Sequence, residues 1–170
     1  MKALATLLGL TAGVALCVAP AGKQAPRAAE AELTAAQSDY LAQCGGCHGI
    51  QGNTAPAPVP ILKARVGYFM CTEAGRRFLI RLPNVSYARV DDESLADMMN
   101  FVVFGLGAST APANARGFTA EEVGELRRHP MVGSELQDTR KLVVEELIRS
   151  CGAPADLRFA YPGEGPETHR

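Results

Sequence analysis

Cys44-Gly45-Gly46-Cys47-His48 is the stretch that decides the fold of this chain. Two thiols stand close together and an imidazole follows at once, so the chain has to turn tightly here, which glycine permits. A redox-active cysteine pair would follow a strand within a βαβ unit, and a structural zinc ion would need four ligands. The sequence has no strand before this stretch and no second Cys or His pair at ligand spacing. A disulfide between Cys44 and Cys47 would be strained and would leave His48 without a role.

The pattern Cys-x-x-Cys-His is instead the attachment signal for a covalent haem. The thiols of Cys44 and Cys47 add across the two vinyl groups of the porphyrin, which fixes its edge at two points. The imidazole of His48 then lies beneath the iron as its proximal ligand. The sequence therefore predicts one covalently bound haem c.

The composition fits a single domain built around a bulky cofactor. A chain of 170 residues most simply forms one domain. Aromatic residues make up only 6% and Trp is absent, so a haem would supply bulk that the side chains lack. With 17 Lys and Arg against 18 Asp and Glu, the chain has no basic excess, and we expect no nucleic-acid partner.

Residues 1–21 have the form of a secretory signal peptide. Lys2 gives a positive start, 3–18 is uncharged and apolar, and Ala19-Pro20-Ala21 has the small-x-small form of a cleavage site. We expect cleavage near Ala21, a flexible leader over 22–31 and a location in the periplasm. A retained signal segment would instead attach the chain to the membrane.

The remaining sequence predicts an all-α fold. Thr34 to Gln37 fits a capping box, and the acidic residues from Asp91 open a helix whose apolar positions recur at helical spacing. Glycines at 105 and 107 end that helix, and two more helices follow. The predicted helices cover 34–44, 91–105, 119–128 and 134–150, with capping boxes at Thr119–Glu122 and Ser134–Gln137 and a helical turn or two within 66–82.

From residue 34 to residue 104 the sequence resembles class I cytochrome c. Tyr40 and Phe101 lie where that family places the aromatic pair of its first and last helices, and 90–102 looks like its acidic-opened last helix. Pro60-Ile61-Leu62 is similar to the family's Pro-x-Leu step. The resemblance implies that the Pro60 carbonyl accepts the Nδ1–H of His48 and leaves Nε2 for iron. It also implies a cytochrome c-like haem domain over 32–106, with additional helices in an extension over 107–170 packed on it.

The second axial ligand is where the sequence departs from that family. Class I cytochromes have an axial Met in the loop before the last helix, whereas the corresponding segment 82–89 contains no Met or His. A thioether ligand would favour electron transfer, and an open position would admit small ligands. The candidates are Met131 and His129 in the extension, Met98 and Met99 on the predicted helix, Met70 beside Cys71, and an iron without a second protein ligand.

Cys71 and Cys151 remain as an even pair. Thiols oxidise outside the cytoplasm, so we expect a disulfide between them that links the extension to the haem domain; two separate thiols or pairing with another chain are the alternatives. The apolar residues expected to bury against the haem domain are Leu126, Val132, Leu136, Val143, Val144 and Leu147. The arginines expected either to pair with haem propionates or to form a solvated basic face are Arg65, Arg76, Arg77, Arg81 and Arg89.

Together these features predict an electron carrier rather than an enzyme. Its iron would take an electron from a dehydrogenase or another redox donor and pass it to a downstream acceptor, while the protein supplies ligation, burial and docking. An open second axial position would instead indicate a haem protein that binds small ligands or reacts with peroxide. A third hypothesis is a dedicated cytochrome subunit of a dehydrogenase complex, docked through its C-terminal helices.

Overall fold

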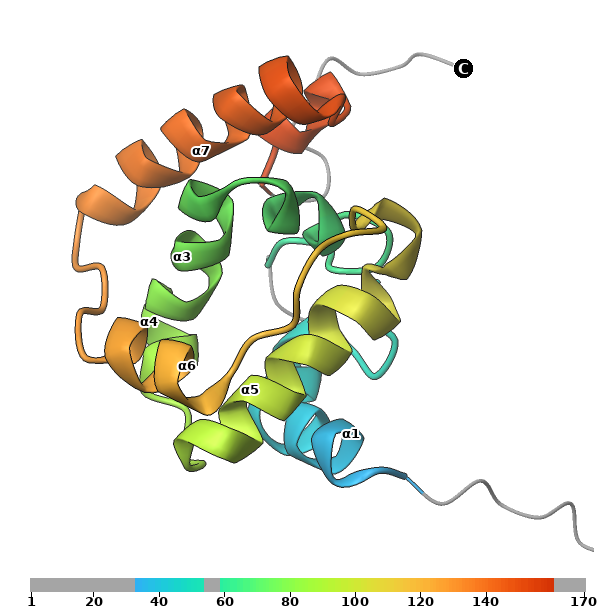
Figure 1. Cartoon of the computed structure of the whole chain (residues 1–170), viewed down its shortest axis with the longest axis vertical. Coiled ribbons are helices and arrows are strands. Elements are labelled where there is room, and N and C mark those ends of the chain that lie inside the picture. The colour runs from blue at the N-terminus through green and yellow to red at the C-terminus, as the bar shows by residue number, and fades with distance from the viewer. Residues whose placement is uncertain (1–32, 54–58, 161–170) are drawn as a thin grey trace, which may run out of the picture. The chain divides into compact units, whose positions relative to one another are not determined.

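Every regular element in the computed structural model is a helix, within the residues that it describes, 33–53 and 59–160 (Figure 1). The prediction of an all-α, cytochrome c-like fold is thereby confirmed, while the predicted signal peptide and leader lie outside the described residues. In chain order the elements are α1 (Ala35–Tyr40), a π-helical turn (Leu41–Gly45), α2 (Gly46–His48), a 3-10 segment (Val66–Cys71), α3 (Glu73–Arg81), α4 (Pro83–Ser86), α5 (Asp92–Asn100), a second π-helical turn (Phe101–Leu106), a 3-10 turn (Ala108–Thr110), α6 (Ala120–Arg127), α7 (Glu135–Cys151) and a last 3-10 turn (Ala155–Arg158).

Helix α1 begins at the predicted capping box. The Thr34 hydroxyl accepts a hydrogen bond from the Gln37 amide at 3.2 Å, and the Gln37 side chain accepts one from the Thr34 amide at 2.9 Å, so two otherwise unpaired donors are satisfied. Tyr40, at the end of α1, is 1% exposed. Its ring packs edge-on against Phe101 with 5.6 Å between centroids. This aromatic pair joins α1 to the turn that continues α5.

Helix α5 is the central element of the core. Asp91 caps it by accepting a hydrogen bond from the Ser94 amide at 2.8 Å, and Leu95 and Met98 on its inner face are fully buried. The helix continues through the π-helical turn and ends at Gly107. A Cβ on Gly67 would come within 2.4 Å of the Gly107 carbonyl oxygen, so the 3-10 segment and the end of α5 meet backbone to backbone.

The C-terminal extension is tied to α3 by a buried arginine. Arg76 is 3% exposed and forms an ion pair with Glu122 of α6, with 2.5 Å between Nε and Oε1. Its guanidinium also donates to the carbonyls of Arg116 and Gly117 at 2.6 and 2.7 Å and lies 4.2 Å from the centroid of the Phe118 ring. The segment that leads into α6 is therefore fixed on α3.

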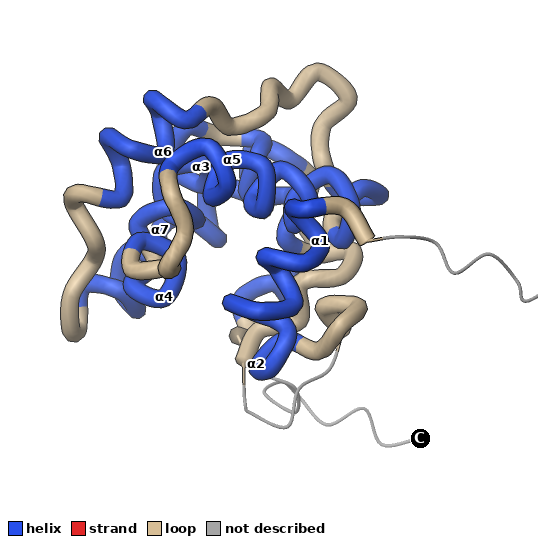
Figure 2. Tube along the Cα trace, turned by 90° about the horizontal axis from the view of Figure 1, so that it is seen from below, coloured by secondary structure: helices blue, strands red, loops and turns tan. Residues whose placement is uncertain are grey.

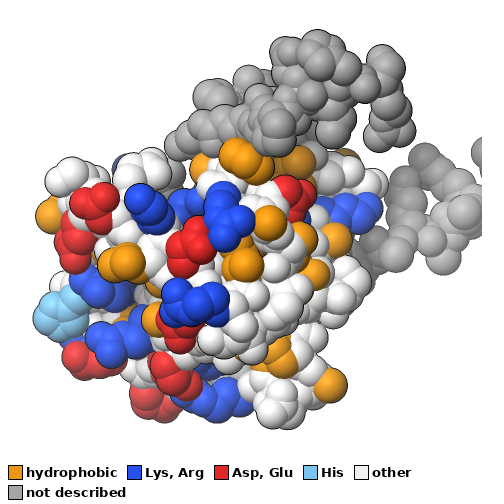
Figure 3. Space-filling view, turned by 90° about the horizontal axis from the view of Figure 1, so that it is seen from above, with side chains coloured by type: hydrophobic (Ala, Val, Ile, Leu, Met, Phe, Trp, Pro, Cys, Tyr) orange, Lys and Arg blue, Asp and Glu red, His pale blue; other side chains and the backbone are white. Residues whose placement is uncertain are grey.

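Two more arginines of the predicted basic cluster bind the extension as well. Arg65 forms an ion pair with Asp156 at 3.0 Å. Arg81 donates to the His129 carbonyl at 2.6 Å and lies 3.8 Å from Glu135. The sequence predicted that these arginines would either face solvent or pair with haem propionates. It did not predict that they bind the C-terminal part of the chain. On the face that Figure 3 shows, Lys and Arg side chains lie among Asp and Glu side chains rather than in a patch of one sign.

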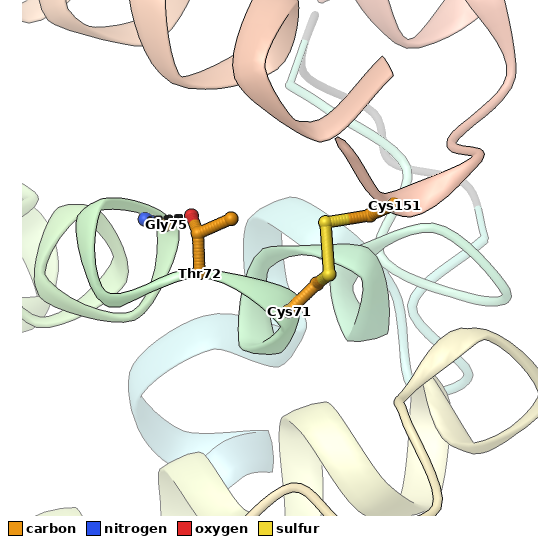
Figure 4. The surroundings of a disulfide bond; sticks show 4 residues. All are labelled: Cys71, Thr72, Gly75 and Cys151. Atoms are coloured by element: carbon orange, nitrogen blue, oxygen red, sulfur yellow. Dashed lines mark hydrogen bonds between the residues drawn. A yellow bond between two sulfur atoms is a disulfide. The ribbon is translucent and has the colours of Figure 1, made fainter. Parts of the chain in front are cut away.

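Helix α7 is linked to the 3-10 segment by a disulfide. Cys71, at the end of the 3-10 segment, is bonded to Cys151, 80 positions later at the end of α7, with 2.01 Å between the sulfurs (Figure 4). The inner face of α7 buries Val143, Val144 and Leu147. None of the described helices is long and apolar enough to cross a membrane.

Two expectations for the extension are wrong. Ser134 precedes α7 but makes no side-chain cap, because its backbone is already helical (φ −67°, ψ −23°), whereas a capping side chain requires an extended residue. Val132 is 65% exposed rather than buried. The neighbouring Met131 is turned inward instead, since its amide donates to the Arg81 carbonyl at 2.9 Å.

Candidate functional site

The Cys-x-x-Cys-His stretch lies on one continuous helical segment formed by α1, the π-helical turn and α2. The Gly49 amide donates to the Gly45 carbonyl at 2.8 Å, and Gly49 ends the segment with a positive φ of 74°, a conformation that favours glycine. Cys44 is half-buried, Cys47 is exposed, and neither is in a disulfide. Both thiols are thus free to bind a cofactor.

His48 is oriented by the backbone of a distant loop. Its Nδ1 lies 2.9 Å from the Pro60 carbonyl oxygen, so Nδ1 carries the proton and donates it. Burial lowers the pKa of His48, against the opposing effect of this hydrogen bond, and therefore favours the neutral ring that metals bind. The lone pair on Nε2 remains for iron, as the resemblance to class I cytochromes implies.

Tyr40 fixes the end of the helical segment that carries the Cys-x-x-Cys-His stretch, which we call the attachment segment. Its hydroxyl donates to the Gly49 carbonyl at 2.7 Å. Burial, with the nearby Cys44 thiol, raises the pKa of Tyr40 to about 12, so the phenol remains a donor. Burial, with Cys47, raises the pKa of the Cys44 thiol to about 11. Sequence reasoning placed Tyr40 in the core but missed its hydrogen bond, for which a buried tyrosine's need of a polar partner was the available signal.

The segment 82–90 lies near the attachment segment, although it carries no Met or His. The Arg89 amide donates to the Gln43 side chain, one residue before Cys44, at 3.2 Å. The Ser86 hydroxyl donates to the Ile80 carbonyl at 2.8 Å and holds α4 against α3. Figure 2 shows α1 and α2 on one side and α4 on the other, with α3, α5 and α6 above them.

Arg127, at the end of α6, also binds the segment 82–90. Its guanidinium donates to the carbonyls of Ser86, Ala88 and Val90 at 3.0, 2.7 and 2.9 Å, and forms an ion pair with Asp92 at 3.0 Å. Sequence reasoning missed this residue, because carbonyl acceptors exist at every position and leave no pattern in the sequence.

The five candidates for a second axial ligand do not come together around His48. Met98 and Met99 lie in the core on α5, Met70 is buried in the 3-10 segment, and Met131 is buried beside α3. His129 is on the surface at the end of α6, with Nε2 3.7 Å from Glu125. Cys44 packs against the same core that contains the four methionines, and His129 is turned towards Glu125.

The donor set fits a haem better than a metal ion bound directly. Within the described residues no group of three or more His, Cys, Asp or Glu side chains is placed to hold a metal. The Cys-x-x-Cys-His stretch offers instead two free thiols separated by two glycines. It also offers one neutral imidazole whose Nδ1 is already hydrogen-bonded. Leu41, Leu62 and Leu82 are half-buried and pack against the core.

An all-α fold with such a motif is the arrangement of a c-type cytochrome. The chain is 28% identical to a cytochrome c-552 of Thermus thermophilus over 130 residues, which cover 64% of this chain and 88% of the relative. It is also 28% identical to a second cytochrome c-552 of Thermus thermophilus over 118 residues, or 59% of this chain and 90% of that relative. No family model matches the chain. The relatives support a c-type cytochrome and imply covalently bound haem c.

Proposed function

We propose that this chain is a mono-haem, class I type cytochrome that carries electrons in the periplasm. It accepts an electron from a dehydrogenase or another redox protein and passes it to an acceptor protein. The observation that carries the proposal is the hydrogen bond between His48 and Pro60 beside two free thiols. That combination serves covalent attachment and iron ligation together.

The chain's own residues bind and orient the cofactor. When bound, haem supplies an iron that gains and loses one electron. Cys44 and Cys47 hold the porphyrin through thioether bonds, and His48 offers Nε2 to the iron. The Pro60 carbonyl keeps the imidazole from rotating and increases the basicity of Nε2. Tyr40 keeps the attachment segment packed on the core, which limits movement when the charge of the iron changes.

The partner is proposed to dock where the attachment segment reaches the surface. Cys47 is exposed, and Ile50, two residues after His48, is 73% exposed. An apolar side chain at the edge of the haem suits a transient contact with another redox protein, because it brings the two cofactors close together without a strong ion pair.

The test is haem attachment to the full chain, expressed together with the haem-attachment machinery. We expect one haem per chain by mass, which remains bound after denaturation, and an alkaline pyridine spectrum typical of two thioether links. In Cys47→Ala one link remains, and in the Cys44→Ala/Cys47→Ala double variant the haem is lost on denaturation. Rapid mixing of the wild type with a one-electron donor, and then with an acceptor protein, should show reversible reduction.

A matched control is the Cys71→Ser/Cys151→Ser variant, which removes two cysteines outside the motif. It should retain the haem with both links. Absence of covalent haem from the wild type would overturn the proposal. For the location, cell fractionation and the N-terminal sequence of the mature protein are the measurements, and we expect a periplasmic chain that begins near residue 22.

A further inference from the structure

The described side chains can be compared as possible second axial ligands of the haem iron. Haem iron takes protein ligands from His, Met, Cys and Tyr. A side chain that binds iron has to turn its donor atom towards the haem. It therefore cannot be enclosed by protein on all sides, nor be turned towards solvent by another bond.

The described cysteines and the second described histidine are engaged elsewhere. Cys71 and Cys151 are bonded to each other, and the other two cysteines belong to the attachment motif. The His129 side chain is 68% exposed, and its Nε2 is turned towards Glu125, one turn earlier on α6, which is 63% exposed. This imidazole faces a solvated carboxylate rather than the attachment segment.

The methionines of the described chain are enclosed by protein. Met98 is 0%, Met131 1%, Met99 3% and Met70 7% exposed. All four belong to the same hydrophobic core as Tyr40. Their neighbours cover each side chain almost completely, so a methionine would have to leave the core to place its sulfur at the iron.

The segment 82–90, which the resemblance places on this side of the haem, contains no Met, His or Cys. Leu82 and Val85 are half-buried and apolar. Tyr87, its one side chain of a ligating type, is 68% exposed and stands between Ser86 and Ala88, whose carbonyls Arg127 holds. The segment therefore lacks the thioether that class I cytochromes place there, and a Tyr87→Phe variant tests the phenol.

We propose that this chain leaves the second axial position of its haem iron to a small exogenous ligand. The proposal rests on the proposed function, because it requires haem at Cys44 and Cys47. The ligands of suitable chemistry are neutral diatomic molecules for ferrous iron and small anions for ferric iron. The apolar side chains of Leu82 and Val85 favour the neutral ligands, since an anion loses more hydration on entering such surroundings.

The experiment is a carbon monoxide titration of the reduced, full-length holoprotein, followed by its absorption spectrum. We expect ready binding with a shift of the Soret band. The oxidised protein should lack the far-red charge-transfer band of a thioether ligand and should bind cyanide. Met98→Leu, Met131→Leu, His129→Ala and Tyr87→Phe should each change the dissociation constant for carbon monoxide by less than about threefold, well under 1.4 kcal/mol.

The opposite results separate this inference from the proposed function. A holoprotein with covalent haem that refuses carbon monoxide, or shows the far-red thioether band, would overturn the open position and leave the cytochrome assignment intact. A large increase in carbon monoxide affinity in any of the four variants would also overturn the open position, because it would show that the removed side chain competes for the iron. The same holds for His169→Ala, which lies beyond the described residues. Failure to attach haem would overturn both proposals together.

Discussion

Arg76 is a charged side chain placed almost wholly inside the protein. Its substitution by methionine keeps much of the volume but removes the ion pair with Glu122 and the bonds to two carbonyls. The Glu122 carboxylate then loses the buried positive charge that balances its own. We therefore expect Arg76→Met to lower the free energy of unfolding by about 3 kcal/mol. Denaturant unfolding measures the loss. Arg77→Met, at the exposed neighbouring position, is the matched control and should change stability by less than about 0.5 kcal/mol.

The same ion pair predicts a dependence of stability on pH. Burial opposes the ionisation of Glu122, but the hydrogen bonds and charges of Arg76 and Arg116 outweigh it and hold the pKa of this carboxyl below its ordinary value. A carboxyl with a lowered folded pKa contributes stability above its unfolded pKa and loses it as the pH falls through the folded pKa.

We therefore expect the stability difference between the wild type and Glu122→Gln to be largest near neutral pH. It should narrow as the pH falls below the ordinary value for glutamate. Urea unfolding at a series of pH values measures both proteins. Glu121→Gln, one position earlier, measures the pH dependence that the start of the helix contributes by itself, because local hydrogen bonds there also hold the pKa of Glu121 below its ordinary value. A difference that stays constant throughout the acid range would contradict the role of the ion pair.

At the scale of elements, α6 controls the segment 82–90 through one side chain. Removal of the Arg127 guanidinium leaves three carbonyls without their donor. We expect Arg127→Gln to destabilise the fold by about 2 kcal/mol and to speed hydrogen exchange of amides 86–92 at least about tenfold. Exchange monitored by mass spectrometry locates the change.

Arg128 provides the matched control for this prediction. It follows Arg127 at the end of the same helix, is 61% exposed and, among the described residues, pairs with Glu125 one turn earlier. Arg128→Gln should leave exchange in 86–92 unchanged, because exposed pairs of this kind contribute little. Equal effects from the two substitutions would mean that α6 acts through general stability rather than through this contact.

Local patterns predicted the elements well where a cap is built from neighbouring residues. The Thr34 capping box is present, and Asp91 opens α5 as its acidic run indicates. Thr119 caps α6, but its partner Glu122 turns away to Arg76, so only half of that predicted box forms. Ser134 fails because the preceding turn sets its backbone. At Thr119 a contact made elsewhere in the fold overrides the local preference, and at Ser134 the neighbouring turn does.

In the candidate site, too, the part built from neighbouring residues could be predicted and the part built from distant residues could not. The attachment side is visible in the sequence because both thiols and the imidazole lie within five consecutive residues. The Pro60 contact was implied by the resemblance, and its geometry is present. The other side is held by Arg127, which binds backbone carbonyls 37 to 41 positions away, and no sequence pattern marks a carbonyl as an acceptor. The burial of the methionines likewise depends on packing across several helices.

At the scale of the whole molecule, α6 and α7 pack on α3 and are joined covalently to the earlier part of the chain. Removal of the Cys71–Cys151 bond in the double serine variant frees a loop of 80 residues, for which chain entropy predicts a loss of about 4 kcal/mol. Thermal or denaturant unfolding measures this loss. A thiol count on the unfolded, unreduced holoprotein should find neither cysteine free, and two free thiols would remove the disulfide.

The disulfide also determines what a protease can release. Cys71 lies after the attachment motif and Cys151 closes α7, so the bond encloses α3 to α7 in one covalent ring. A single cut anywhere in that ring opens it but separates no fragment. Digestion through exposed sites such as those around Gly133 should therefore leave one haem-stained band of full length on a non-reducing gel, and two pieces only after reduction. The molecule can thus be cut in its extension and still keep its haem and its last helix on one covalently joined particle.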